Sequence, residues 1–210
     1  MAARPLLPLP DYRRIFQVTY SVLEASGIAK THRACIMFAS VGVLLLREEY
    51  KLPATISAGC MAMMVDEGNA DVVIYGRERE GVYVGEEDAF HAWVECDGWL
   101  IDFMAPIMGD SLLADGHPRK VPRRMLQKRL EDRQGDPRHI QHEGEFYVRH
   151  DSVLMAQLLD QQGVQFGDLI KVCQAWFRRP PKPLKEILLG DSGGPPRKLV
   201  LRAPEIDGVW

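Results

Sequence analysis

The first fifty residues contain two helical patterns of hydrophobic residues that differ in kind. Between residues 11 and 25 apolar side chains recur on one side of a helix, and Gly27 follows as a stop signal. Thr31 is a good N-terminal cap for a second helix that continues to about Tyr50. Because this second segment is apolar on every side as far as Leu46, we predict that it is a buried helix.

The middle of the chain has the shorter apolar runs and alternation that are typical of β-strands. We predict strands at residues 55–65, 71–75, 82–84, 91–96, 99–103, 146–149 and 198–201. The stretch 109–142 is rich in Pro, Gly and charge, and we expect it to be irregular apart from a short helix at about 122–130. Two more helices are predicted at 151–161 and 166–177. Helices followed by consecutive strands predict an α+β fold and not alternating βαβ units.

Composition narrows the class of protein. Hydrophobic residues make up 46% of the 210 residues and charged residues 26%, which supports a packed core. The net charge of −3 gives no indication of a nucleic-acid partner. The longest apolar run, 34–46, is shorter than the roughly 20 residues that span a bilayer. We expect a cytoplasmic protein with no membrane partner and one domain over 1–210, with its core at about 10–106 and a helical, irregular extension at 107–210.

The strongest local signal is Asp97-Gly98, which lies between two apolar strands and is typical of a two-residue type I′ hairpin turn. A turn of this type pairs Cys96 with Trp99 and Val94 with Ile101. The register of the two flanking strands is therefore predicted from the sequence.

This register places chemically useful side chains together. Strand side chains alternate between faces, so His91, Trp93 and Glu95 share one face with Asp102. Asp102 then lies diagonally across from His91, within reach of a carboxylate–imidazole hydrogen bond. The other interpretation is an edge hairpin with scattered polar residues on its solvent side.

Cys35 supplies a nucleophile for such a pair. It lies in the first turn or so of the predicted buried helix, where the helix dipole and free N–H groups favour a thiolate. A cysteine, a histidine base and an orienting carboxylate form a catalytic triad. Taken alone, Cys35 is also explained as a small core residue, which is how we interpret Cys60, Cys96 and Cys173.

Two segments resemble a known family. The first is Thr31-His32-Arg33-Ala34-Cys35, with Phe38-Ala39, Leu44-Leu45-Leu46-Arg47 and Leu52-Pro53-Ala54 after it. The second is His91-Ala92-Trp93-Val94-Glu95, followed by Gly98-Trp99-Leu100-Ile101-Asp102. Together they are similar to the cysteine helix and to the histidine and aspartate strands of the transglutaminase-like superfamily, bacterial-type members included. The resemblance covers about residues 31–106. Ile36, where the family usually has a small residue or tryptophan, and the region after Pro106 depart from it and leave the substrate open.

The resemblance implies a papain-like core, with the cysteine-bearing helix packed on an antiparallel sheet and further helices near the C-terminus. It implies Cys35 as nucleophile, His91 as general base and Asp102 as orienting acid. The expected activity is that of a cysteine hydrolase of amidase or peptidase type, or of an acyltransferase. The expected substrate is a peptide or a small acyl compound, attacked through a thioester, with no metal or organic cofactor. The alternative is a catalytically silent binding or scaffold protein of the same fold.

Four further residues are candidates for the surroundings of the triad. Trp93 is expected to line the site or to fill the core. Glu95 shares the His91 face and is expected to contact the site or to face solvent at the end of the hairpin. His32 lies near the predicted nucleophile and is expected to line the site or to help the helix begin. An acyl-transfer site also needs a donor for the developing oxyanion. The backbone N–H of Cys35 is available by position, and Gln17 is a candidate side-chain donor.

Two other motifs give weaker indications of a site. Gly190-Asp191-Ser192-Gly193-Gly194-Pro195 reproduces the segment around the nucleophile of chymotrypsin-like serine proteases. Those enzymes have two β-barrels and a histidine segment near the N-terminus, whereas the first fifty residues here are predicted to be helical. A serine hydrolase is therefore a minor alternative, and Ser192 is interpreted as a loop residue. His139 and His142 have an i, i+3 spacing but no evident third metal ligand, which favours a solvated loop.

Overall fold

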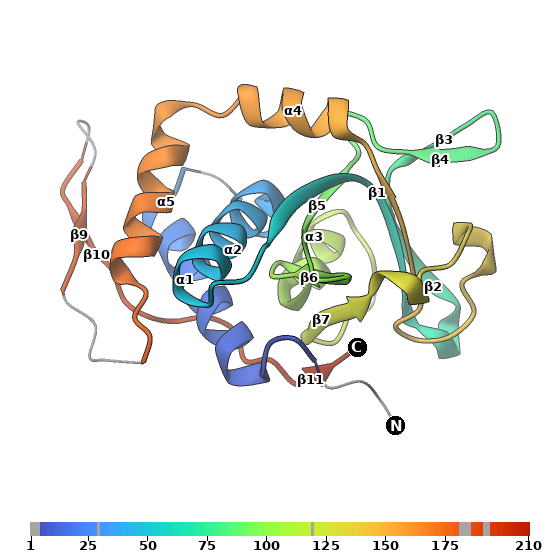
Figure 1. Cartoon of the computed structure of the whole chain (residues 1–210), viewed down its shortest axis with the longest axis horizontal. Helices are drawn as coiled ribbons and strands as arrows, with labels where there is room; N and C mark the ends of the chain where they lie inside the picture. Colours follow the sequence, from blue (N-terminus) through green and yellow to red (C-terminus); the bar gives the residue numbers. More distant parts are fainter. Residues whose placement is uncertain (1–4, 29, 119, 181–185, 191–193) are drawn as a thin grey trace.

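A β-sheet covered by helices forms the centre of the protein (Figure 1) in the computed structural model, which describes residues 5–28, 30–118, 120–180, 186–190 and 194–210. The strands of the main sheet follow the order β11-β7-β6-β5-β1-β2, and β8 also pairs with β1. Every pair in this sheet is antiparallel except the short pair β11–β7. The fold is therefore α+β with a mostly antiparallel sheet, as the sequence predicts.

The helices and strands have the following bounds. The helices are α1 Leu9–Ser26, α2 Cys35–Glu49, α3 Met108–Ala114, α4 Ser152–Asp160 and α5 Val164–Trp176. The main sheet contains β1 Thr55–Asp66, β2 Asp71–Tyr75, β5 His91–Cys96, β6 Trp99–Asp102, β7 Arg124–Arg129, β8 Phe146–His150 and β11 Gly208–Val209. Two small hairpins are formed by β3 Arg77–Arg79 with β4 Val82–Val84, and by β9 Leu188–Leu189 with β10 Arg197–Lys198.

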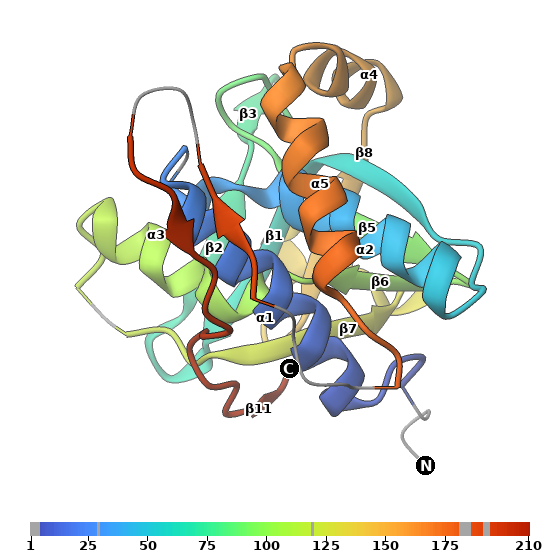
Figure 2. The ribbon, with the colours of Figure 1, turned by 90° about the vertical axis from the view of Figure 1, so that its left-hand side faces the viewer.

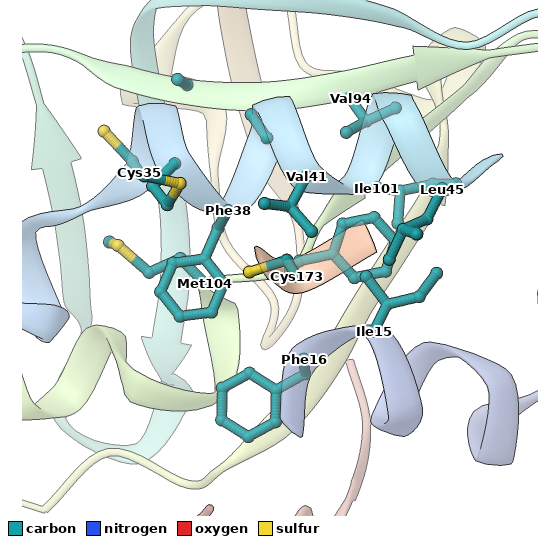
Figure 3. Close-up of a cluster of buried hydrophobic side chains, with 14 of the residues drawn as sticks. Ile15, Phe16, Cys35, Phe38, Val41, Leu45, Val94, Ile101, Met104 and Cys173 are labelled. Atoms are coloured by element: carbon teal, nitrogen blue, oxygen red, sulfur yellow. The ribbon is translucent and has the colours of Figure 1, made fainter. Parts of the chain in front are cut away.

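The helix α2 is buried between the sheet and other helices, which confirms the prediction from its apolar sequence. It packs on β5 on one side and against α1 and α5 on the other (Figures 1 and 2). In Figure 3, Phe38 and Leu45 of α2 lie in the same cluster as Ile15 of α1. Gly42 allows the close approach of α2 to the sheet, because a Cβ atom there would come within 2.5 Å of the Phe103 ring.

The start of α2 differs from the prediction. Thr31 belongs to a short 3₁₀ turn, Thr31–Arg33, and its hydroxyl donates to the carboxylate of Glu24 instead of capping a helix. The residue that directly precedes the α-helix is Ala34, which has no side chain that can cap it. The α-helix begins four residues later, and Cys35 is its first residue.

The strand β7 replaces the short helix predicted at residues 122–130. It pairs with β6, with Asp102 opposite Leu126 and Ile101 opposite Gln127. Pairing with the free edge of β6 and burial of Leu126 and Gln127 outweigh the weak local preference for a helix. The strands β7 and β8 and the helix α5 all come from the predicted C-terminal extension, so this region completes the sheet and the helical layer instead of adding to a finished core.

The predicted hairpin is confirmed. Val94 lies opposite Ile101 and Cys96 opposite Trp99. Asp97 and Gly98 have φ values of 49° and 76°, which are the two positive φ angles that a type I′ turn requires.

Gly59 is the point where the long strand β1 passes from one neighbour to another. It lies opposite His91 of β5 and opposite His150 of β8. A Cβ atom on Gly59 would be 2.0 Å from the carbonyl oxygen of Arg149, so only glycine fits there. This close packing fixes the beginning of β5 against the middle of β1.

In the described part of the chain, no helix combines the length and apolar character needed to cross a bilayer. All four cysteines are buried and free. No three metal-binding side chains converge among the described residues.

Candidate active site

His91 and Asp102 form a buried hydrogen-bonded pair across the β5–β6 hairpin. The distance from His91 Nε2 to Asp102 Oδ2 is 2.8 Å, and the two side chains are 0% and 1% exposed. The second carboxylate oxygen, Oδ1, accepts the backbone N–H of Met104 at 2.8 Å. Both oxygens of Asp102 are therefore occupied, and the carboxylate is held in one orientation toward the imidazole ring.

Cys35 faces the same cavity as His91. The cavity measures about 340 Å³, and both residues line it. Cys35 lies at the N-terminal end of α2 (Figure 3), where its side chain is 5% exposed. Its backbone N–H has no hydrogen-bond acceptor among the described residues, as is usual for the first residue of a helix.

The protonation of His91 is set by competing influences. Burial lowers the pKa of His91, but the charge and hydrogen bond of Asp102, with a further contribution from Cys35, together raise it from 6.5 to about 10. The raised pKa favours the protonated ring. Its second ring nitrogen, Nδ1, is buried and is not bound by Asp102, and a side-chain hydrogen bond with Cys35 contributes to the raised pKa of the ring.

The roles of the two ring nitrogens are exchanged relative to the serine-protease triad. There the carboxylate binds Nδ1 and the nucleophile faces Nε2. Here Asp102 binds Nε2, so the atom left for proton exchange is Nδ1 of His91. The carboxylate again selects the tautomer, now the one in which Nδ1 can accept a proton when the ring is neutral.

Tyr75 of β2 stacks on the His91 ring. The ring centroids are 4.7 Å apart and the planes make an angle of 26°. The end of β2 and the beginning of β5 meet on one edge of β1, because His91 is opposite Gly59, Tyr75 is opposite Met61 and β8 pairs with the other edge of β1. Burial, and then the charges of Asp102 and Cys35, raise the pKa of Tyr75, so the phenol stays protonated.

Buried polar atoms without partners gather at this cavity. They are the hydroxyl of Tyr75 and Nε2 of His32, and both residues line it. Arg33 and Asp115 form an ion pair at its exposed rim. Unpaired buried donors and acceptors are rare in folded proteins, and each costs about 1–3 kcal/mol. Their concentration here is typical of a site whose ligand supplies the missing partners.

Three of the expected site-lining residues lie elsewhere. Trp93 is fully buried in the core cluster on the His91 face of the sheet, and its indole N–H donates to Glu95 at 3.0 Å. The cavity lies at the N-terminal end of β5, next to His91. Trp93, which is further along the strand on the same face, therefore points into packed core and not into the cavity. Gln17 is on α1 and does not line the cavity. Of the four candidates, only His32 is at the site.

Ser192 lies outside the described residues. Its described neighbours Gly190 and Gly194 line a separate cavity of about 240 Å³ that has no residue in common with the one at Cys35. The cavity that His91 lines therefore contains Cys35 and none of the described residues of the Gly190–Pro195 segment.

Sequence reasoning missed several residues of the cavity. Tyr75, Ser111, Asp115 and Phe90 line it alongside the predicted His32. Tyr75 lies in a correctly predicted strand, but only the pairing of β2 with β1 reveals that its ring reaches His91. Ser111 and Asp115 come from the region that was expected to be irregular.

The chain belongs to the family described as "Protein of unknown function (DUF2026)", whose model matches residues 8–210. It is also similar to a solved structure described as "The crystal structure of genomics APC5867". The two share 29% sequence identity with a TM-score of 0.82, and the match covers 99% of this chain and 98% of the other. No match was found among curated proteins. The solved structure therefore has the same overall fold along the whole chain.

Proposed function

We propose that the protein is a cysteine-dependent acyl-transfer enzyme, either an amidase- or peptidase-like hydrolase or an acyltransferase. Cys35 is the nucleophile, His91 the general base and Asp102 the residue that orients His91. The observation that carries the proposal is the convergence of Cys35 and the His91–Asp102 pair, which come from three separate elements, at one cavity. The fold supports it too, because a cysteine-bearing helix packs on the antiparallel sheet that carries the histidine and aspartate, as in the transglutaminase-like and papain-like folds.

The resting site is a thiolate–imidazolium pair, with the Cys35 proton held on Nδ1 of His91. The raised pKa of His91 supports this state. The thiolate attacks the carbonyl carbon of an amide or ester, the bond to the leaving nitrogen or oxygen breaks, and the leaving group takes the proton from His91. Water or an amine then attacks the thioester and gives a proton to His91, which releases the acyl group and restores the thiolate.

The oxyanion that develops during each attack needs hydrogen-bond donors. The backbone N–H of Cys35 is one, since no described group accepts from it. The hydroxyl of Tyr75 is the second donor in the proposal, because it is buried, protonated and without an acceptor beside the His91 ring. It takes the place that the sequence suggested for Gln17.

Limiting iodoacetamide at pH 6 with peptide mass mapping tests the ion pair. An ordinary thiol with a pKa of about 8.5 is only about 0.3% ionised at this pH. Burial raises the pKa of Cys60 and Cys96 to about 11 and that of Cys173 to about 12, so these three remain unreactive thiols. We expect Cys35 to react at least about 10-fold faster than N-acetylcysteine. A rate no faster than that of N-acetylcysteine would favour the catalytically silent binding protein.

Acyl transfer itself is tested with p-nitrophenyl acetate. We expect a burst of one nitrophenol per protein molecule and an acetyl group that mass mapping locates on Cys35. Cys35→Ala should lose both, whereas Cys96→Ala, which removes a thiol outside the cavity, should keep both. Alkylation of Cys35 without acetylation would show a reactive thiolate that does not perform acyl transfer.

A further inference from the structure

A groove continues from the cavity at Cys35 along the edge of the sheet. It measures about 420 Å³ and shares Ile74, Tyr75, Ser111 and Asp115 with that cavity. One wall consists of the six consecutive residues 70–75, which include all of β2. A groove over one face of a strand is lined by alternate residues, because side chains alternate between faces. Lining by every residue from 70 to 75 therefore means that the groove runs along the backbone edge of β2.

The edge of β2 is open to pairing. In the described part of the chain, the backbone of residues 72–75 is hydrogen-bonded only to β1. In an antiparallel ladder, every second residue turns its N–H and C=O away from the partner strand, and here these groups turn toward the groove. Proteins usually protect such an edge with charges or proline. Residues 72–75 are Val-Val-Ile-Tyr, and Ile74 is 39% exposed.

We propose that an extended polypeptide segment binds in this groove as an additional strand on β2 and presents a carbonyl group to Cys35. This inference rests on the proposed function and specifies its substrate class as a polypeptide, in place of a small acyl compound. The C-terminal end of β2 lies at the catalytic cavity, because Tyr75 stacks on His91. At about 3.3 Å per residue, the five residues of β2 give an edge of roughly 16 Å, enough for four or five substrate residues.

The opposite wall of the groove favours a single chain over a second copy of the protein. That wall is formed by Ser111 and Leu112 of α3 and by Asp115 and His117 after it. In the proposal, the additional strand lies between this wall and β2. A second copy would have to bring its own α3 wall into the same groove in order to pair edge to edge, so we assign the groove to a peptide.

Peptides with a thiol-reactive group test the proposal without knowledge of the natural substrate. Two sets of mixed tetrapeptides are used, one with a C-terminal vinyl sulfone and one with an N-terminal acryloyl group, so that both directions from the reacting carbon are covered. The rate of Cys35 modification is measured by intact mass and divided by the rate with iodoacetamide. We expect at least one set to react about 10-fold faster than the matching single-residue probe, and to lose this gain when its backbone nitrogens are methylated.

A matched pair of variants checks that the gain comes from β2. Ile74→Lys places a charge on the groove edge and should reduce the normalised peptide rate about 10-fold. Val82→Lys introduces the same charge at a residue of β4 that is 43% exposed and does not line the groove, and it should keep the full rate.

The outcomes separate this inference from the function on which it rests. Rapid alkylation at pH 6 with no gain from either peptide set would overturn the peptide groove and leave the acyl-transfer proposal intact. Slow alkylation of Cys35 by iodoacetamide itself would overturn both. A sedimentation experiment in which Ile74→Lys converts a dimer to a monomer would assign the edge to a second copy and would also overturn the peptide groove.

Discussion

Asp102→Asn isolates the charge at the centre of the proposed triad. The side chain keeps its size, and its carbonyl oxygen can still accept the N–H of Met104, which Asp102 binds at 2.8 Å. The amide nitrogen then faces Nε2 of His91, where the carboxylate now lies at 2.8 Å. An amide donor at that position favours the neutral ring with its proton on Nδ1, which is the wrong tautomer for a base that serves Cys35.

The expected magnitude follows from the two influences on His91. Asp102 is the main group that raises its pKa, and burial, the largest single influence, lowers it. Without the carboxylate charge the pKa of His91 falls, and the proposed ion pair is lost. An isolated thiol is about 0.3% ionised at pH 6, so alkylation of Cys35 at this pH should slow by up to about 300-fold. Acyl transfer should fall further, since the corresponding change in a serine protease lowers kcat about 10⁴-fold.

The assay is the rate of Cys35 carbamidomethylation between pH 5 and pH 9, followed by peptide mass mapping. The wild type should react rapidly at pH 6, whereas Asp102→Asn should approach the wild-type rate only near pH 9. Asp136→Asn, which removes an exposed carboxylate paired with Arg138, is the matched control and should react as the wild type does. An Asp102→Asn protein that is folded and reacts at the wild-type rate at pH 6 would refute the assigned role of Asp102.

Three further predictions concern stability and the second oxyanion donor. The folded-state pKa of His91 is raised from 6.5 to about 10, so its contribution to stability is complete below pH 6.5 and is lost as the pH rises through 10. The midpoint of urea unfolding should therefore decline between pH 7 and pH 10. His91→Gln should lack this pH-dependent part of the decline. In urea unfolding, Gly42→Ala should destabilise the protein by about 1–3 kcal/mol, because the added Cβ would collide with the Phe103 ring. Gly167→Ala in α5 should stabilise it by about 0.5–1 kcal/mol in the same measurement, because a Cβ there meets no atom within 4 Å. Tyr75→Phe keeps the ring that stacks on His91 and should change the free energy of unfolding by less than about 1 kcal/mol, because the lost hydroxyl has no partner. It should slow acetylation by p-nitrophenyl acetate about 100-fold. An unchanged rate would exclude the hydroxyl as a donor.

The hairpin shows which part of the site was predictable from the sequence. A two-residue turn fixes the register of its strands through local geometry alone, so Asp97-Gly98 sufficed to bring His91 and Asp102 together. The burial of the helix that carries Cys35 was predictable for a similar reason, since a helix with apolar residues on every side is stable only when protein surrounds it. Both inferences depend on interactions within short segments.

The features that were predicted wrongly, or not at all, depend on contacts with residues distant in sequence. The hydroxyl of Thr31 donates a hydrogen bond to Glu24, and residues 124–129 form a strand because they pair with β6. Which end of β5 opens to a cavity is decided by the packing of β1, β2 and α3, so alternation alone could not separate His91 from Trp93. Tyr75 is the clearest case, since its contact with His91 exists only because β2 and β5 pair with successive stretches of the same edge of β1.

Stability alone does not account for the polar groups at the cavity. A buried ion pair such as His91–Asp102 is often no more stabilising than apolar residues of the same size, because both groups lose their hydration. The hydroxyl of Tyr75 and Nε2 of His32 add unpaired buried atoms at the same place, each costing about 1–3 kcal/mol against a total stability of about 5–15 kcal/mol. A core selected only for folding would replace these groups with apolar side chains. Under the proposed function, these groups beside Cys35 are the cost expected of a site that is preorganised for a substrate.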